Sequence, residues 1–133
     1  MAHAATLTGA ARPVSWTGRV LSSIIVLFMV FDATIHLLEP APVVDAFAHL
    51  GVPLHLSVGI GVIALICTAL YAVPQTSVLG ALLLTAYLGG ATATQVRAEA
   101  AWFPVLFPSL MGALLWGGLA LRDSHVRALL TSN

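Results

Sequence analysis

Three ionisable side chains follow one another at helical spacing near the end of a long apolar run. The run begins at Val20, and its last part, "VFDATIHLLEP" (residues 30–40), contains Asp32, His36 and Glu39. On a helix, side chains three and four residues apart lie on the same stripe. A carboxyl group beside an imidazole suits general acid–base chemistry, because the imidazole takes up and releases a proton near neutral pH. Asp32 and His36 are therefore the candidate catalytic residues.

Further polar side chains are expected at the same depth as this stripe. At ~1.5 Å per helical residue, Asp32 lies roughly 20 Å and Glu39 roughly 30 Å beyond Arg19, between the outer half of a bilayer and its outer surface. A charged carboxylate there costs on the order of a few kcal/mol unless it is paired, protonated or turned to the bundle interior. The groups predicted to bind a substrate or a headgroup there are Glu39, His49, His55, Gln95, Arg97 and Glu99.

His36 and Glu39 also have the spacing of half a carboxylate–histidine metal site, which His49 or His55 would complete. No second paired motif occurs on another predicted helix, so we expect no metal site. The histidines gather toward one end of the predicted helices, which also disfavours a haem held by two of them. The single Cys67 has no partner for an intramolecular disulfide and is interpreted as a packing residue.

The composition requires that lipid cover most of the surface. Of 133 residues, 59% are hydrophobic and 8% are charged, and the mean hydropathy is +1.01. A soluble domain carries roughly a quarter charged residues. Lysine is absent and five arginines balance five acids, so the chain has no basic patch for nucleic acid. The chain is predicted to be an integral membrane protein.

Four segments are long enough to cross a ~30 Å hydrocarbon core, which takes roughly 20 apolar residues. Because backbone groups in lipid must be hydrogen-bonded internally, these segments are predicted to be helices. Small residues in "GGATAT" (89–94) and "GALLWGG" (112–118) would let neighbouring helices approach closely. The predicted fold class is all-α, an integral membrane four-helix bundle with spans at Val20–Leu38, Leu54–Val73, Val78–Val96 and Phe103–Leu121.

The connection between the first two spans has a helical pattern of its own. The stretch "PVVDAFAHLG" begins with proline and ends with glycine, and its apolar residues recur at helical spacing. We predict a short interfacial helix over residues 42–50, across the outer mouth of the bundle. It would be either a lid over the polar stripe or a covered connection.

The arginines predict the orientation of the bundle. Four spans put both termini on one side, which carries Arg12, Arg19, Arg122 and Arg127, whereas the other side carries only Arg97 and four of the five acids. The positive-inside bias then favours two cytoplasmic tails, residues 1–14 and 124–133, around a transmembrane domain of residues 15–123. An aromatic belt is expected at Trp16 and Tyr71 on the inner side and at Trp102 on the outer side.

Two stretches, "FDATIHLLEPAPVVDAFAHLGVP" and "LLLTAYLGGATATQVRAEAAWFPVLFPSLMGALLWGGLALRD", resemble the DoxX-like family of small four-helix bacterial membrane proteins. The resemblance covers roughly residues 18–123, and the stretch from the third to the fourth span is its more specific part. It implies a location in the bacterial cytoplasmic membrane. Wider relatives are linked to quinone-coupled sulfur oxidation and to redox-stress complexes, so the resemblance also implies a redox-linked role.

The chain departs from the family pattern at one position. A histidine often stands just before the residues that match Val96 and Arg97, where this chain has Gln95. A glutamine neither takes up a proton nor binds most metals well. The resemblance therefore supports no role that depends on that histidine.

Three functions remain open for the polar stripe. In a redox-linked membrane subunit, His36 would hydrogen-bond a quinone carbonyl, Asp32 would relay a proton, and small residues in the third and fourth spans would leave room for the ring. In an intramembrane enzyme such as an isomerase, the same two residues would serve as acid and base on a lipid-soluble substrate, with Glu39 or Glu99 orienting the imidazole. In a structural scaffold, the stripe would only fix helix register. Quinone is the candidate cofactor, and the candidate partners are the lipid bilayer, a membrane redox protein that supplies electrons, and further copies of the chain.

Overall fold

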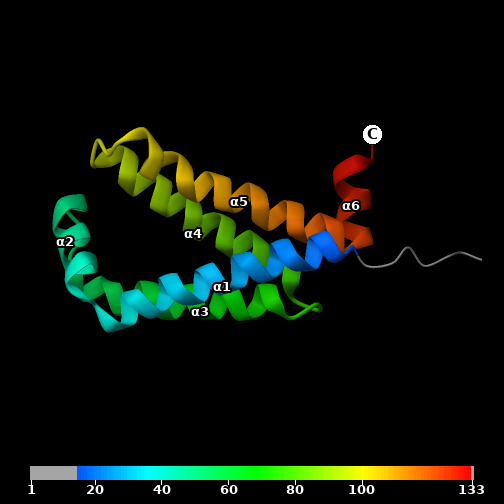
Figure 1. Ribbon diagram of the computed structural model, residues 1–133, viewed down its shortest axis with the longest axis horizontal. Coiled ribbons are helices and arrows are strands. Elements are labelled where there is room, and N and C mark those ends of the chain that lie inside the picture. Colours follow the sequence, from blue (N-terminus) through cyan, green and yellow to red (C-terminus); the bar gives the residue numbers. More distant parts are fainter. Residues whose placement is uncertain (1–14, 133) are drawn as a thin grey trace, which may run out of the picture.

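The computed structural model describes residues 15–132, and within that range every regular element is a helix (Figure 1). Each of the four predicted spans and the predicted short helix is confirmed, with ends shifted by at most four residues. A single turn, η1, leads directly into α3, and the two together form one apolar span, Leu54–Ala72. The elements in chain order are α1 (Trp16–Leu38), α2 (Ala41–Leu50), η1 (Leu54–Leu56), α3 (Ser57–Ala72), α4 (Ser77–Arg97), α5 (Trp102–Arg122) and α6 (Ser124–Thr131).

The long helices expose many large apolar side chains, as helices surrounded by lipid do. The four spans contain 19 to 23 residues each and are apolar enough to cross a membrane. Large side chains such as Leu27 (70% exposed) and Phe31 (62% exposed) face outward from α1. Since a helix satisfies its own backbone groups, such a surface is stable in hydrocarbon. The chain is therefore a multi-pass membrane protein.

The four spans form a ring in which α1 packs on α3 and α5, and α4 packs on the same two helices. The core inside the ring includes Ile25, Met29, Leu84 and Leu115, and Cys67 is buried in it as predicted. Figure 1 shows α2 lying across one end of the bundle, here called the α2 end. The start of α1 and all of α6 lie at the other end, here called the terminal end.

Glycines let the helices approach most closely near the terminal end. A Cβ atom on Gly80 of α4 would overlap the backbone of Tyr71 in α3, and one on Gly118 of α5 would lie 2.9 Å from Ser22 Oγ in α1. The expectation that "GALLWGG" brings helices together is thus confirmed at Gly118. It is wrong at three other glycines of the two small-residue stretches, where a Cβ atom would meet nothing within 4 Å, namely Gly89, Gly90 and Gly117.

Tyr71 is completely buried, so its predicted place in an aromatic belt is wrong. Its hydroxyl donates a hydrogen bond to the carbonyl oxygen of Leu115 (2.9 Å) and lies within hydrogen-bonding distance of Ser22 Oγ (3.1 Å). A phenol has an apolar body and one polar atom, and here the polar atom finds its partners in the core rather than among headgroups. Tyr71 thereby joins α3 to α1 and α5, whereas Trp16 and Trp102 are exposed at opposite ends of the bundle, as a belt requires.

The predicted tail over residues 124–133 contains the amphipathic helix α6. The carboxylate of Asp123 accepts hydrogen bonds from the backbone N–H groups of His125 and Val126, which caps the helix. Val126 is buried against the core, while Leu129 and Leu130 are exposed. The other predicted tail, residues 1–14, lies outside the described residues.

Candidate functional site

Asp32 and His36 stand together on α1, inside the span and toward the α2 end. His36 Nε2 lies 3.8 Å from Asp32 Oδ2, because a four-residue spacing stacks side chains on a helix. The His36 side chain is 17% exposed and that of Asp32 is 25% exposed, so both are partly accessible. Asp32 lies roughly 9 Å before the end of α1 at Leu38. The two candidate catalytic residues are therefore close enough to act as a pair.

Tyr87 of α4 is a third member of this group. Its hydroxyl donates a hydrogen bond of 2.8 Å to Asp32 Oδ2. A carboxylate that accepts a hydrogen bond is stabilised in an apolar bundle, and such charge-assisted bonds are the stronger ones. Sequence reasoning missed Tyr87, although a phenol in the middle of an apolar span requires a polar partner.

Ser57, the first residue of α3, binds the other side of His36. Its hydroxyl donates to the backbone carbonyl of His36 (2.8 Å), and its oxygen lies 3.4 Å from His36 Nδ1. The two helices meet closely here because Gly61 of α3 has no side chain, and a Cβ atom there would lie 2.9 Å from the Ala33 carbonyl oxygen. Ser57 is fully buried and was also missed from the sequence.

The directions of these hydrogen bonds determine where protons are needed. The hydroxyl hydrogen of Ser57 is used on the His36 carbonyl, so the Ser57 oxygen accepts from Nδ1–H of the imidazole. His36 Nε2 and Asp32 Oδ2 then face each other as two acceptors unless a proton lies on one of them. The 3.8 Å between these two atoms is within ion-pair distance and too long for a direct hydrogen bond.

Helix α2 covers His36. Phe47 is buried, and its ring packs edge-on against the imidazole with 5.5 Å between centroids. Asp45 and His49 lie on the exposed side of the same helix. Arg97 Nη2 donates an exposed hydrogen bond of 3.4 Å to the Leu50 carbonyl oxygen. This bond links the end of α4 to the end of α2. Phe47 of α2 therefore covers part of the His36 imidazole.

The remaining candidates lie around the α2 end but outside this network. Glu39 ends α1 in a left-handed backbone conformation (φ 47°), and its N–H donates to the Ile35 carbonyl. Within residues 15–132, no set of three or more His, Cys, Asp or Glu side chains is placed to hold a metal ion. No side-chain hydrogen bond or ion pair in the same range joins Asp32 or His36 to Glu39, His49, His55, Gln95, Arg97 or Glu99.

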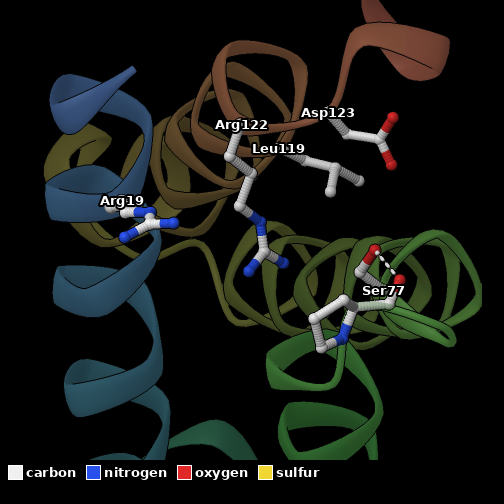
Figure 2. Close-up of a pocket in the computed structure, with 6 residues that line it drawn as sticks. Arg19, Ser77, Leu119, Arg122 and Asp123 are labelled. Carbon is white, nitrogen blue, oxygen red and sulfur yellow. Dashed lines mark hydrogen bonds between the residues drawn. The ribbon is translucent and has the colours of Figure 1, made fainter. Parts of the chain in front are cut away.

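Two cavities lie away from the pair. One, of about 220 Å³, lies between α4 and α5 beside Gly89 and Gly112, so small residues in the third and fourth spans do leave room there. It is on roughly the opposite side of α4 from Tyr87, since successive residues turn by about 100°. The other, of about 270 Å³, lies at the terminal end (Figure 2). Neither cavity is lined by Asp32 or His36.

The family comparison covers the helices that build this site. The model of the DoxX-like family matches residues 20–118, a range that includes Asp32, His36, Ser57 and Tyr87 and ends before α6. No curated protein and no solved structure matches the chain. Because the family match spans most of the sequence, the chain belongs to the DoxX-like family.

Proposed function

We propose that this protein is a redox-linked membrane subunit in which Asp32 and His36 exchange protons with a quinone. The observation that supports this is the pairing of His36 Nε2 with Asp32 Oδ2, 3.8 Å apart, within an apolar bundle. Tyr87 donates to the same Asp32 oxygen that faces His36, and the Ser57 hydroxyl lies beside His36 Nδ1, so both contacts restrict the orientation of the pair. The redox link of the wider relatives agrees with this proposal.

The proton balance defines the role of each group. Reduction of a quinone to a quinol consumes two electrons and two protons. His36 would donate its Nε2 proton to a quinone carbonyl oxygen, and Asp32 would pass the next proton to the imidazole. The electrons would come from a partner redox protein in the membrane. Protons would reach the pair from the carboxyl and imidazole groups at the α2 end, namely Glu39, His49, His55 and Glu99.

The surroundings of the pair suit a flat, mostly apolar ligand. Phe28 lies one helical turn from Asp32, and its ring packs edge-on against Phe107 at 5.4 Å between centroids. Sites for small ligands are lined mainly by apolar and aromatic side chains with a few polar groups that set orientation. Because Phe47 covers His36, α2 would have to shift for a ring to enter. The long Arg97–Leu50 bond is the polar contact that such a lid movement would break.

The proposed location is the bacterial cytoplasmic membrane, with both termini in the cytoplasm. The arginine bias supports this orientation, since Arg19, Arg122 and Arg127 lie at the terminal end and Arg97 at the other. The Asp32–His36 pair would then exchange protons from the outer half of the bilayer.

The test measures how much quinone is retained by variants that can still form hydrogen bonds but lack the titratable group of Asp32 or His36. Asp32→Asn and His36→Gln retain polar atoms but cannot carry the proton. Wild-type protein, gently solubilised from its membranes, should copurify with quinone, and both variants should lose it while remaining folded and equally abundant. Thr34→Ala is the matched control, because Thr34 lies on the exposed side of α1 and its hydroxyl donates only to the Val30 carbonyl.

Two other results would replace the proposal. If Asp32→Asn and His36→Gln retain as much quinone as the wild type and keep its cellular role, the network serves only to fix the register of the helices. A different lipid-soluble compound could copurify instead. If the purified protein converts that compound and the two variants do not, the pair is assigned to acid–base catalysis.

A further inference from the structure

The cavity at the terminal end is bordered by two arginines. It has a volume of about 270 Å³ and is lined by Arg19, Pro74, Ser77, Leu119, Arg122 and Asp123 (Figure 2). It lies where α1 and α4 begin and where α5 ends, at the membrane-surface end of three spans. A water molecule occupies about 30 Å³ of liquid. The cavity therefore has room for a group of several heavy atoms.

The guanidinium of Arg122 is fixed in position but incompletely satisfied. Its Nη2 donates to the Tyr71 carbonyl oxygen (2.7 Å), and its central carbon lies 4.7 Å from the centre of the Tyr71 ring. Its Nε atom is buried and has no hydrogen-bond partner among the described residues. A buried donor on a charged group is costly to leave unpaired. Since Nη2 makes the only hydrogen bond of this guanidinium within residues 15–132, the group keeps N–H donors for an acceptor.

Within the described part of the chain, neither arginine forms an ion pair with an acidic side chain. Asp123 lines the cavity, but its carboxylate accepts the backbone N–H groups that begin α6, and Figure 2 shows it turned away from Arg122. Arg19 extends from α1 toward Arg122 in the same view and makes no side-chain hydrogen bond or ion pair within residues 15–132. The chain has five acids, and the other four belong to the second half of α1, to α2 or to the loop after α4.

The first turn of α4 adds to the positive field. Ser77 is the first residue of this 21-residue helix and lines the cavity. Free N–H groups and the helix dipole place partial positive charge at such an end. Two guanidinium groups and a helix N-terminus thus surround one space, and all three attract an anion.

We propose that this cavity binds a phosphate group, with Arg19 and Arg122 as its charged partners. The planar guanidinium presents paired N–H donors that match phosphate oxygens. The phosphate would belong to an anionic phospholipid headgroup or to free inorganic phosphate. The site lies at the headgroup end of the spans, and basic pockets between spans are typical binding places for anionic headgroups. It is separate from the Asp32–His36 pair and does not depend on the function proposed for that pair.

The experiment compares lipid retention by charge-matched variants of the full chain. The wild type, Arg19→Gln and Arg127→Gln are purified in detergent and titrated with phosphatidylglycerol or phosphatidylcholine, and bound lipid is counted by native mass spectrometry. Arg127 is the control because it lies at the same end of the bundle but does not line the cavity. Wild type and Arg127→Gln should retain phosphatidylglycerol in preference to phosphatidylcholine. Arg19→Gln should bind phosphatidylglycerol about fivefold more weakly, which corresponds to about 1 kcal/mol for one arginine near the membrane surface. Arg19 is exposed, so its loss should leave the fold intact.

A parallel titration with inorganic phosphate distinguishes the source of the phosphate group. Phosphate could stabilise the wild type against heat and not stabilise Arg19→Gln, while the wild type shows no preference for phosphatidylglycerol. This result would support the site, with a soluble anion as its ligand. If neither phosphatidylglycerol nor phosphate distinguishes Arg19→Gln from Arg127→Gln, the proposal is wrong.

Discussion

The hydroxyl of Tyr87 reaches across the helix ring to Asp32, with 2.8 Å between the two oxygen atoms. Tyr87 belongs to α4 and Asp32 to α1, and these helices pack mainly on α3 and α5 rather than on each other. The bond therefore connects opposite sides of the ring near the α2 end. It also fixes the carboxylate that faces His36.

Replacing Tyr87 with phenylalanine should weaken both the fold and the site. Tyr87→Phe removes the hydroxyl that donates to Asp32 and leaves His36 as the other neighbour of the carboxylate. We expect a loss of about 1 kcal/mol in the free energy of unfolding, the usual size for a hydrogen bond between membrane helices. Quinone retention should also fall, because Asp32 loses its orientation. Unfolding in mixed detergent and quinone extraction measure the two effects, and unchanged retention would remove Tyr87 from the site.

Tyr71 should matter more for stability and not at all for the quinone. Tyr71→Phe removes the donor to the Leu115 carbonyl and leaves the buried Ser22 hydroxyl without Tyr71 as a partner. The expected loss is about 1–3 kcal/mol, the penalty for leaving a buried polar group unsatisfied. Because the change is near the terminal end, quinone retention per folded molecule should equal that of wild type. A smaller loss of stability than in Tyr87→Phe would contradict this ranking.

Two glycines in α4 should respond oppositely to the same substitution. Gly80→Ala places a Cβ atom into the backbone of Tyr71, so α3 and α4 could not keep their spacing. The yield of monodisperse protein should fall sharply. Gly89→Ala meets open space and should be neutral or stabilising by up to about 1 kcal/mol, because alanine favours a helix more than glycine does. Equal tolerance at both positions would mean that the close contact at Gly80 does not hold the bundle together.

Reporter fusions should establish the orientation. A reporter that is active only outside the cytoplasm should stay silent when fused after Asn133 and become active when fused after Gly51, which follows α2. The arginine distribution and the even number of spans lead to this expectation. Activity after Asn133 would reverse the orientation and place the Asp32–His36 pair on the cytoplasmic side.

The fold was predictable because its signals are local. Length and hydropathy identify each span, and proline and glycine delimit α2. The Asp32–His36 pair was predictable for the same reason, since four residues on one helix fix the distance between two side chains. None of these inferences requires knowing which helices are neighbours.

The partners of the pair were not predictable, because they depend on how the helices pack and rotate. Tyr87 lies 55 residues from Asp32, and Ser57 lies 21 residues from His36. Tyr71 shows the same limit. A tyrosine at the end of a span can point to the headgroups or to the core. Tyr71 points to the core because Ser22 and the Leu115 carbonyl there provide partners for its hydroxyl. The small-residue stretches were misread at Gly89 because glycine also occurs where helices leave a space.

The order of helices around the ring sets when the protein becomes stable during synthesis. Because α1 packs on α3 and α5, the first span made is fully covered only after the last one enters the membrane. Until then the face of α1 that carries Ser22 is open, and the Tyr71 hydroxyl lacks the Leu115 carbonyl. Unsatisfied polar groups in hydrocarbon cost several kcal/mol each. A nascent chain that stops after α4 should therefore be a substrate for membrane proteases, and the protein should escape degradation only when its final span is inserted.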